Sequence, residues 1–194
     1  MSTSAGGQSA KTALREQVLA ARRQQPPGVG AADVAAVALA WEPVRRASTV
    51  AAYVSVGREP STRPLLDALR ARGTRVLLPV LQPDNDLDWA AYEGPDDMVQ
   101  AARGLLEPAG ARLGVDVVRT ADVVLVPGLA VSPTGDRLGR GGGSYDRALA
   151  RVGAGTPVAV VLHVDEVGLP VPTEPHDRPV THALTPAGVV VLGS

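Results

Sequence analysis

The sequence predicts an α/β fold: a single-domain, mostly parallel (mixed) sheet with helices on both faces, in a Rossmann-like three-layer arrangement. Two observations support this prediction. Short apolar runs rich in β-branched residues alternate with helix-like segments, the order expected when helices connect parallel strands. In addition, the run 122–126 is apolar after its first residue, as a strand buried on both faces would be.

The predicted helix at 61–71 has Leu65, Leu66 and Leu69 on one face, and Gly73 is placed to end that helix. The predicted helices span 10–24, with Ser9 as N-cap, 33–41, 61–71 and 144–151. The predicted strands span 48–54, 75–80, 87–92, 122–126, 158–162 and 189–192. The run 87–92 alternates polar and apolar residues, which predicts an antiparallel or edge strand.

The composition fits one domain, because 45% of the 194 residues are hydrophobic, enough to bury a sizeable core. Residues 1–9 are mostly Ser, Gly and Ala; we expect a disordered tail there and a single domain over 10–194. The net charge of −1 gives no basic excess for nucleic acid, and no apolar run approaches the roughly 20 residues that span a bilayer. The chain has no cysteine, which excludes disulfides and thiol catalysis and fits a reducing cytoplasm.

A glycine-rich stretch over 127–146 follows the strand 122–126 and embeds Arg137 and Arg140 among five glycines. Glycine allows close backbone approach, successive free amides can form a nest for an anion, and arginine offers a fork suited to phosphate. The stretch therefore predicts a polyphosphate cradle at the carboxyl end of a central strand, where open α/β sheets place ligands. It is neither a Walker A loop nor a dinucleotide fingerprint, and on composition alone it could be a loop without a ligand.

This stretch resembles the signature of the 5-formyltetrahydrofolate cyclo-ligase family, also called 5,10-methenyltetrahydrofolate synthetases. That family carries Pro-Gly-Leu-Ala-Phe and then Gly-x-Arg-Leu-Gly-(Arg/Tyr)-Gly-x-Gly-Tyr-Tyr-Asp-Arg. The matching segments here are 127–130, 137–143 and 145–147. Val131 replaces the usual Phe, and Ser144 replaces the first Tyr of the pair. We expect Ser144 to change how the substrate is held, not the reaction.

Weaker matches extend the resemblance over nearly the whole chain, at 11–15, 53–59, 104–108 and 172–177. The resemblance implies an enzyme that uses ATP and Mg²⁺ to convert 5-formyltetrahydrofolate to 5,10-methenyltetrahydrofolate, ADP and phosphate. Within the site it implies catalytic roles for Arg137 and Arg140. The predicted ATP-binding residues are Lys11, Arg15, Arg137, Leu138, Gly139, Arg140, Gly141, Gly142, Gly143, Ser144 and Tyr145. The predicted folate-binding residues are Val54, Glu59, Trp89, Arg140, Gly141, Gly142, Gly143 and Ser144.

The cations of the N-terminal helix lie on one edge of it, because Lys11, Arg15 and Arg22 fall within roughly 40° of one another at helical spacing. A lone helix with such a stripe is more often a solvated face. The resemblance favours the functional interpretation, since cyclo-ligases use the matching Lys and Arg on ATP. Either Arg22 or Arg23 could continue the stripe, and the helical geometry favours Arg22.

Three carboxylates complete the predicted site. The family pattern implies that Asp146 and Asp177 hold Mg²⁺, which prefers one or two carboxylates together with phosphate oxygens and waters. It also implies that Glu59 bonds the amino group and ring N–H of the pterin. From the residues alone, Asp146 could equally be a helix-start acid, Asp177 a loop acid and Glu59 an acid before a helix. Trp89 is a candidate to line the folate pocket, although it could equally belong to the core.

Two other functions remain open from the sequence. A phosphosugar isomerase or a CoA-transferase-like enzyme could bind phosphate through glycine-rich turns on a related fold. A non-catalytic folate or nucleotide binder could use the same site without turnover. Under each of these interpretations we expect a cytoplasmic protein with small-molecule ligands, and we predict a monomer.

Overall fold

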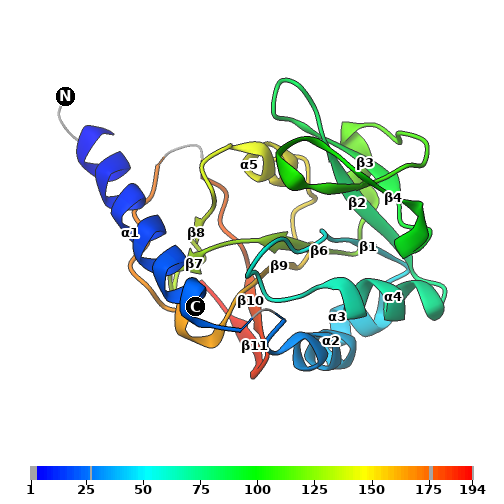
Figure 1. Ribbon diagram of the computed structural model, residues 1–194, viewed down its shortest axis with the longest axis horizontal. Helices are drawn as coiled ribbons and strands as arrows, with labels where there is room; N and C mark the ends of the chain where they lie inside the picture. Colours follow the sequence, from blue (N-terminus) through cyan, green and yellow to red (C-terminus); the bar gives the residue numbers. More distant parts are fainter. Residues whose placement is uncertain (1–3, 27, 175–176, 194) are drawn as a thin grey trace.

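The computed structural model describes residues 4–26, 28–174 and 177–193. Its centre is a seven-stranded sheet in the order β11-β10-β9-β6-β1-β2-β3. The five inner strands pair in parallel, and the two outer strands, β3 and β11, are antiparallel to their neighbours. The predicted mostly parallel, mixed sheet is therefore confirmed, as is the predicted edge position and antiparallel direction of the strand at 87–92 (Figure 1).

The sheet strands are β1 (Thr49–Ala51), β2 (Arg75–Leu81), β3 (Leu87–Ala91), β6 (Val123–Pro127), β9 (Val158–Val161), β10 (His182–Thr185) and β11 (Gly188–Val191). Two small antiparallel hairpins lie outside it: β4 (Met98–Gln100) with β5 (Leu106–Pro108), and β7 (Ala130–Val131) with β8 (Arg137–Leu138). The α-helices are α1 (Ser4–Gln24), α2 (Ala31–Ala40), α3 (Glu42–Arg46), α4 (Arg63–Ala71) and α5 (Ser144–Leu149). The 3₁₀ helices are η1 (Pro95–Asp97), η2 (Ala102–Gly104), η3 (Val115–Thr120) and η4 (Val164–Glu166).

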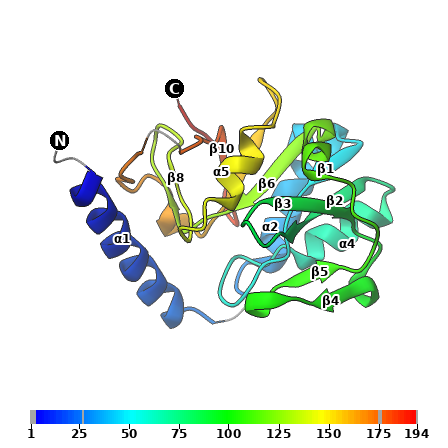
Figure 2. The same cartoon turned by 90° about the horizontal axis from the view of Figure 1, so that it is seen from above.

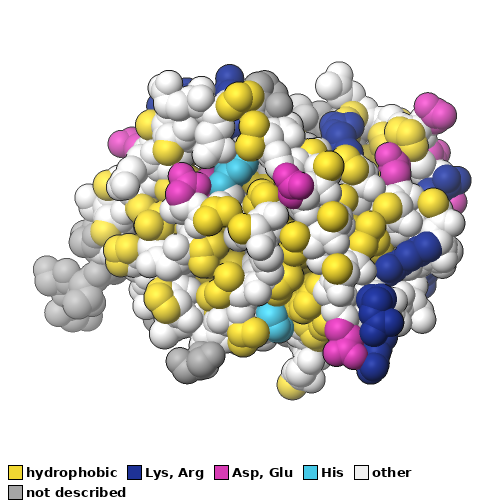
Figure 3. Space-filling model, turned by 90° about the horizontal axis from the view of Figure 1, so that it is seen from below, with side chains coloured by type: hydrophobic (Ala, Val, Ile, Leu, Met, Phe, Trp, Pro, Cys, Tyr) yellow, Lys and Arg dark blue, Asp and Glu magenta, His cyan; other side chains and the backbone are white. Residues whose placement is uncertain are grey.

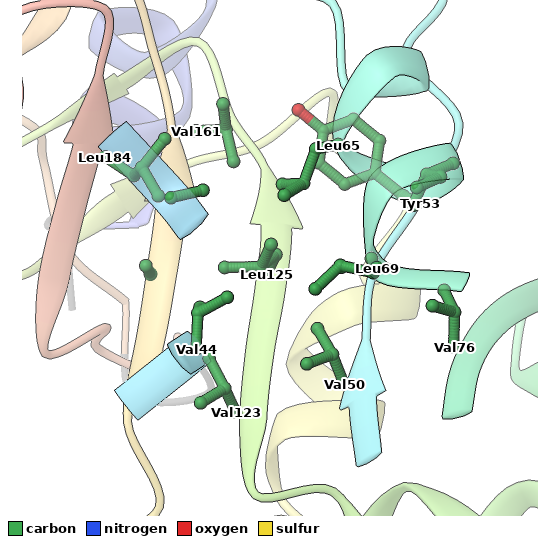
Figure 4. Close-up of a cluster of buried hydrophobic side chains, with 14 of the residues drawn as sticks. Val44, Val50, Tyr53, Leu65, Leu69, Val76, Val123, Leu125, Val161 and Leu184 are labelled. Carbon is green, nitrogen blue, oxygen red and sulfur yellow. The ribbon is translucent and has the colours of Figure 1, made fainter. Parts of the chain in front are cut away.

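The central strand β6 shows why its sequence is almost continuously apolar. Val123 and Leu125 pack on the face covered by α2, α3 and α4, whereas Val124 and Val126 pack on the face covered by α5 and η3. Figure 4 shows the first of these clusters, with Leu125 and Val123 among side chains from the neighbouring strands and from α3 and α4. Burial on both faces makes every position of the strand a core position, which produces the three layers.

Helix α1 differs most from its predicted bounds, because it begins at Ser4 and not at residue 10. Residues 4–9 therefore belong to the helix and not to the predicted tail, and Ser9 lies inside the helix and does not cap it. Residues 1–3 lie outside the described residues. Adding a residue to the end of a helix that has already formed costs little free energy. A prediction of disorder from Ser, Gly and Ala content does not include this effect. That residues 10–194 form a single domain stays a prediction.

Strand β10 was not predicted, because its four residues, with only two apolar side chains between His182 and Thr185, give a short signal. It lies between β9, to which it is parallel, and β11, to which it is antiparallel. Strand β11 thus becomes an edge, and its Val190 and Val191 are exposed.

The view from below shows apolar side chains over much of that face, with Lys and Arg gathered at one side (Figure 3). None of the helices in the described parts of the chain is long and apolar enough to cross a membrane.

Candidate active site

The glycine-rich stretch runs from the carboxyl end of β6 through the β7–β8 hairpin to α5, and α1 lies beside it (Figure 2). Its glycines serve two different purposes. A Cβ on Gly128 would lie 2.5 Å from Val160, and one on Gly135 would lie 2.3 Å from the carbonyl oxygen of Val180, so these two are needed for packing. Gly143 has a φ of 70° and no heavy atom within 4 Å of where its Cβ would be, so backbone around it is open to a ligand.

Arg137 and Asp146 meet at the inner side of this stretch. One terminal nitrogen of Arg137 donates to Asp146 Oδ1 at 3.1 Å, the other donates to the carbonyl oxygen of Pro127 at 3.2 Å, and the guanidinium lies 5.8 Å from the ring centre of Tyr145. Within the described residues, the buried Arg137 Nε has no hydrogen-bond partner. Burial, reinforced by the nearby Glu59 charge, raises the pKa of Tyr145 above its usual value. Arg137 is thus fixed in place with one donor still available.

Arg140 and Glu59 form the second pair, and they come from distant parts of the sequence. Arg140 Nε and one terminal nitrogen both donate to Glu59 Oε1, at 3.3 and 3.0 Å. The other carboxylate oxygen accepts the backbone N–H of Val56 at 3.0 Å. The side chain of Glu59 is 5% exposed and that of Arg140 is 57% exposed. The residue expected to contact the pterin therefore touches a residue expected to contact ATP.

Lys11 and Asp177 form the third pair. Lys11 Nζ donates to Asp177 Oδ2 and to Glu174 Oε2, each at 2.7 Å, and Asp177 Oδ2 also accepts the backbone N–H of Glu174. Burial lowers the pKa of Lys11, but the hydrogen bonds to Asp177 and Glu174 outweigh it and raise that pKa above its usual value. On the next turn of α1, Arg15 Nε donates to the carbonyl oxygen of Gly139 at 2.9 Å. The helix thus contacts both Glu174 with Asp177 and the glycine-rich stretch.

The segment after Asp177 also reaches Asp146, because the backbone N–H of Arg178 lies 3.4 Å from Asp146 Oδ1. The two predicted metal carboxylates thus come from segments that meet at the start of α5. Their donor set suits Mg²⁺, which needs only one or two carboxylates when phosphate oxygens and waters complete its shell. No group of three or more His, Asp or Glu side chains suited to a metal occurs in the described ranges.

The structure separates Arg22 from the predicted ATP stripe. Arg22 is buried and donates to both carboxylate oxygens of Glu166, at 2.6 and 2.8 Å, and to the carbonyl oxygen of Gly128 at 2.8 Å. These bonds attach α1 to the loop after β6, so Arg22 has a structural partner. Arg23, the alternative left open by the sequence, is exposed and lines a shallow pocket beside Arg140. Helical geometry favoured Arg22 because it points in the same direction as Lys11 and Arg15. That direction also buries Arg22 against Glu166, which helical geometry alone does not indicate.

Two predicted folate residues pack against the core to different degrees. Trp89 is 1% exposed and packs with Leu77 and Val124 in the core beneath α5, so its ring is enclosed and the core alternative holds. Val54 is half-buried and packs against the opposite core cluster. Tyr53, by contrast, was not singled out, yet its buried hydroxyl has no hydrogen-bond partner within the described residues. Burial and the Glu59 charge raise its pKa well above the usual value.

Glu166 and Glu174 were also missed by the sequence analysis. Glu166 binds Arg22 and accepts the backbone N–H of His163 at 2.9 Å, and Glu174 shares Lys11 with Asp177. Glu174 lies in the weakly matching segment 172–177 but was not singled out there, and each of the two acquires its role from a partner more than 140 residues away in the sequence. The remaining predicted residues, Leu138, Gly141, Gly142 and Ser144, lie within the stretch between β8 and the first turn of α5.

Comparison with known proteins gives consistent results. The 5-formyltetrahydrofolate cyclo-ligase family model matches residues 7–186. A 5-formyltetrahydrofolate cyclo-ligase of Mycolicibacterium smegmatis is 43% identical over 190 residues, covering 94% of this chain and 97% of the relative. The one from Escherichia coli is 32% identical over 178 residues, covering 90% and 96%.

Solved structures are similar over the same length. The solution structure of Aquifex aeolicus 5,10-methenyltetrahydrofolate synthetase superposes with a TM-score of 0.80 at 26% identity, covering 95% of this chain and 93% of the other. A 5,10-methenyltetrahydrofolate synthetase from Mycoplasma pneumoniae shares the fold, with a TM-score of 0.68 at 19% identity, covering 90% of this chain and 97% of the other. With the family model matching most of its length, the chain belongs to the 5-formyltetrahydrofolate cyclo-ligase family.

Proposed function

We infer that this chain is a 5-formyltetrahydrofolate cyclo-ligase, which converts 5-formyltetrahydrofolate to 5,10-methenyltetrahydrofolate. The observation that supports this best, beside the family match, is the ion pair between Glu59 and Arg140. In an enzyme that transfers a phosphoryl group directly from one substrate to the other, groups that contact the folate and groups that contact phosphate are expected to lie close together. A phosphosugar isomerase gives no reason for this pairing.

ATP is the proposed co-substrate. The formyl oxygen of the folate leaves poorly, so its phosphorylation by ATP gives an iminium-like phosphate ester, whose carbon is then attacked by N10 with loss of phosphate. The protein supplies no nucleophile in this scheme. Its cations, Lys11, Arg137 and Arg140, hold the γ-phosphate in line and offset the charge that spreads over its oxygens during transfer. The open backbone at Gly141 to Gly143 adds N–H donors beside them.

Asp146 and Asp177 would hold Mg²⁺ against the phosphates, and the ion would neutralise part of their charge. In the structure each of these carboxylates instead binds a proposed phosphate cation, Arg137 or Lys11. When ATP and Mg²⁺ bind, Lys11 and Arg137 would bind phosphate oxygens, and Asp146 and Asp177 would be available to hold the metal. Because each cation and each carboxylate would gain a new partner of opposite charge, no charged group would be left unpaired in this partly buried site.

The test of the function is a spectrophotometric assay with purified protein, 5-formyltetrahydrofolate, ATP and magnesium. We expect absorbance of the methenyl product to appear with ADP in equal amounts, and neither to form when any component is omitted. Binding of both ligands without product would favour the non-catalytic binder. ATP hydrolysis that is independent of the folate would argue against the coupled transfer.

The metal assignment has its own test. Asp146→Asn should raise the magnesium concentration needed for half-maximal rate, and Asp177→Asn should do so more mildly, because Asp177 also binds Lys11. Asp165→Asn, on the solvent side of η4, is the matched control. Magnesium titrations of both variants that superimpose on wild type would refute the metal role. A monomeric state and a cytoplasmic location remain proposals that rest on composition alone.

A further inference from the structure

Lys11 differs from every other basic side chain of the protein in its residue type. Of the 19 Lys and Arg residues, it is the only lysine. A guanidinium is a planar fork that suits two-point binding of one carboxylate or phosphate, whereas an ammonium is a compact charge with three donors on a flexible stem. A lysine therefore suits a position where one cation is shared between several oxygens and can move from one set of oxygens to another.

Lys11 is shared between two acids. Its Nζ lies 2.7 Å from both Glu174 Oε2 and Asp177 Oδ2, and the three side chains are 7%, 18% and 16% exposed. The segment that carries Glu174 runs beside the first half of α1 (Figure 2). Two carboxylates held this close repel each other unless a cation lies between them, and carboxylate oxygens are the ligands that Mg²⁺ prefers. The position of Nζ is therefore a cation site, and Lys11 occupies it.

The two acids and helix α1 are held in place by contacts that do not involve this ammonium. Asp177 Oδ2 accepts the backbone N–H of Glu174 at 2.7 Å, which fixes the two acids relative to each other. Arg15 and Arg22 make hydrogen bonds of their own to the glycine-rich stretch and to η4, so α1 stays attached. The Lys11 side chain can thus turn about its flexible stem while the helix and the acids stay where they are.

We propose that Lys11 is an internal counter-ion that keeps a divalent cation from Asp177 and Glu174 until nucleotide binds. The phosphates of the nucleotide then attract the ammonium to their own oxygens, which makes the position between the two acids available to the metal. The inference rests on the proposed magnesium role of Asp177. It extends that role in two ways, because Glu174 shares the cation site and because metal and nucleotide enter together.

The test measures the binding of Mn²⁺ alone, a paramagnetic substitute for Mg²⁺, to protein without nucleotide by electron paramagnetic resonance. Wild type should bind Mn²⁺ weakly, because Lys11 fills the site in most molecules. Lys11→Met should bind it at least about tenfold more tightly, as expected when an occupant present in about nine of ten molecules is removed. Arg15→Met is the matched control: it removes one positive charge from the same edge of α1, but Arg15 donates to a backbone carbonyl, so the affinity should stay near wild type.

Two double variants identify the carboxylates. Adding Asp177→Asn or Glu174→Gln to Lys11→Met should in each case abolish most of the gain, because one of the two acids no longer carries a charge. A gain that survives Glu174→Gln overturns the role of Glu174, and one that survives Asp177→Asn overturns the shared site. Equal gains in Lys11→Met and Arg15→Met also overturn the proposal, since they would reflect the removal of any nearby positive charge.

Urea denaturation checks that each variant is folded before it is titrated. If Lys11→Met does not fold, Lys11→Gln is measured in its place, because its amide can still donate a hydrogen bond to the acids. Wild type also decides by itself, since micromolar binding of Mn²⁺ without nucleotide overturns the proposal. If wild type forms no methenyl product, the proposed function fails; the Mn²⁺ titrations need neither folate nor ATP and still decide the role of Lys11.

Discussion

Two arginine–glutamate pairs, Arg22–Glu166 and Arg140–Glu59, each contribute an arginine to the same shallow pocket, but they differ in burial and in hydrogen bonding. Arg22 and Glu166 are 3% and 5% exposed and are joined by two separate hydrogen bonds, with a third from Arg22 to the backbone. Arg140 is 57% exposed and places two nitrogens on a single oxygen of Glu59.

The difference shows which pair can change partners. Separating two buried charges leaves each without water or counterion, which costs several kcal/mol per ion, so the Arg22 pair is a fixed attachment for α1. Arg140 can leave Glu59 and become hydrated, because more than half of its side chain already contacts water. Similar residue types thus produce a structural contact in one place and an exchangeable one in the other.

The largest expected effect is on stability, from Arg22→Ala. It leaves Glu166 buried without a cation and should lower the free energy of unfolding by about 3–5 kcal/mol. Urea denaturation followed by circular dichroism measures this. Arg23→Ala, one residue along and exposed, should change stability by less than about 0.5 kcal/mol. Adding Glu166→Gln to Arg22→Ala should recover part of the loss, and an additive double variant would contradict the fixed-pair interpretation.

The exchangeable pair should show the opposite pattern. Arg140→Ala should reduce kcat/KM by about one to two decades, the roughly 1.5–3 kcal/mol of a charge-assisted phosphate contact. Its stability should fall by less than that of Arg22→Ala, because water can take the place of the 57% exposed Arg140 side chain beside the buried Glu59. Steady-state kinetics and urea denaturation on the same preparation test both statements. A folded variant with unaltered kinetics would remove Arg140 from the site.

Glu59→Gln tests whether Arg140 is released when its partner loses charge. Folate affinity should fall by roughly 1.5–3 kcal/mol, because a charge-assisted contact to the pterin is lost. Sequence alone predicts unchanged binding of ATP by itself; the structure refines this, since Arg140 freed from Glu59 should bind ATP at least as tightly as before. Calorimetric titrations with each ligand distinguish the cases. Equal weakening of both would mean that Glu59 is structural.

A third pair of intermediate burial gives the smallest effect. Arg151 donates to both oxygens of Asp86, at 2.8 and 2.5 Å, and their side chains are 22% and 13% exposed. These hydrogen bonds lower the pKa of Asp86, although burial opposes them. Asp86→Asn should therefore cost about 1 kcal/mol or less at neutral pH.

The sign of the pH dependence follows from the depressed pKa. In acid the unfolded chain binds a proton at Asp86 before the folded chain does, so the stabilisation is present above about pH 4 and is lost as the pH falls through the folded-state pKa. Denaturation curves of wild type and Asp86→Asn should converge below that range. A difference that stays constant from neutral to acid pH would show that the carboxylate charge is not responsible.

How much could be predicted from the sequence depended on how local the signal was. The strand at 122–126 and the leucines of 61–71 were placed correctly. The spacing of apolar residues along a short segment shows which faces of a strand or helix are buried. The contact of Glu59 with the glycine-rich stretch was expected from the rule that strand ends meet at one edge, and the structure confirms it. The alternatives left open for Arg22 and for Trp89 could not be resolved from the sequence, because the residues that surround them come from distant segments.

The sequence by itself determined the order of the strands and helices in the chain, the apolar core and the cradle of glycines and arginines, since each is set by neighbouring residues. Tertiary structure alone decided which charges would meet. Three predicted cations, Lys11, Arg137 and Arg140, each met a predicted carboxylate, and the partners lie 166, 9 and 81 residues away. The physical reason is that the energy of a charge depends on its burial and nearest partner, and both are set only when the sheet brings remote loops to one edge.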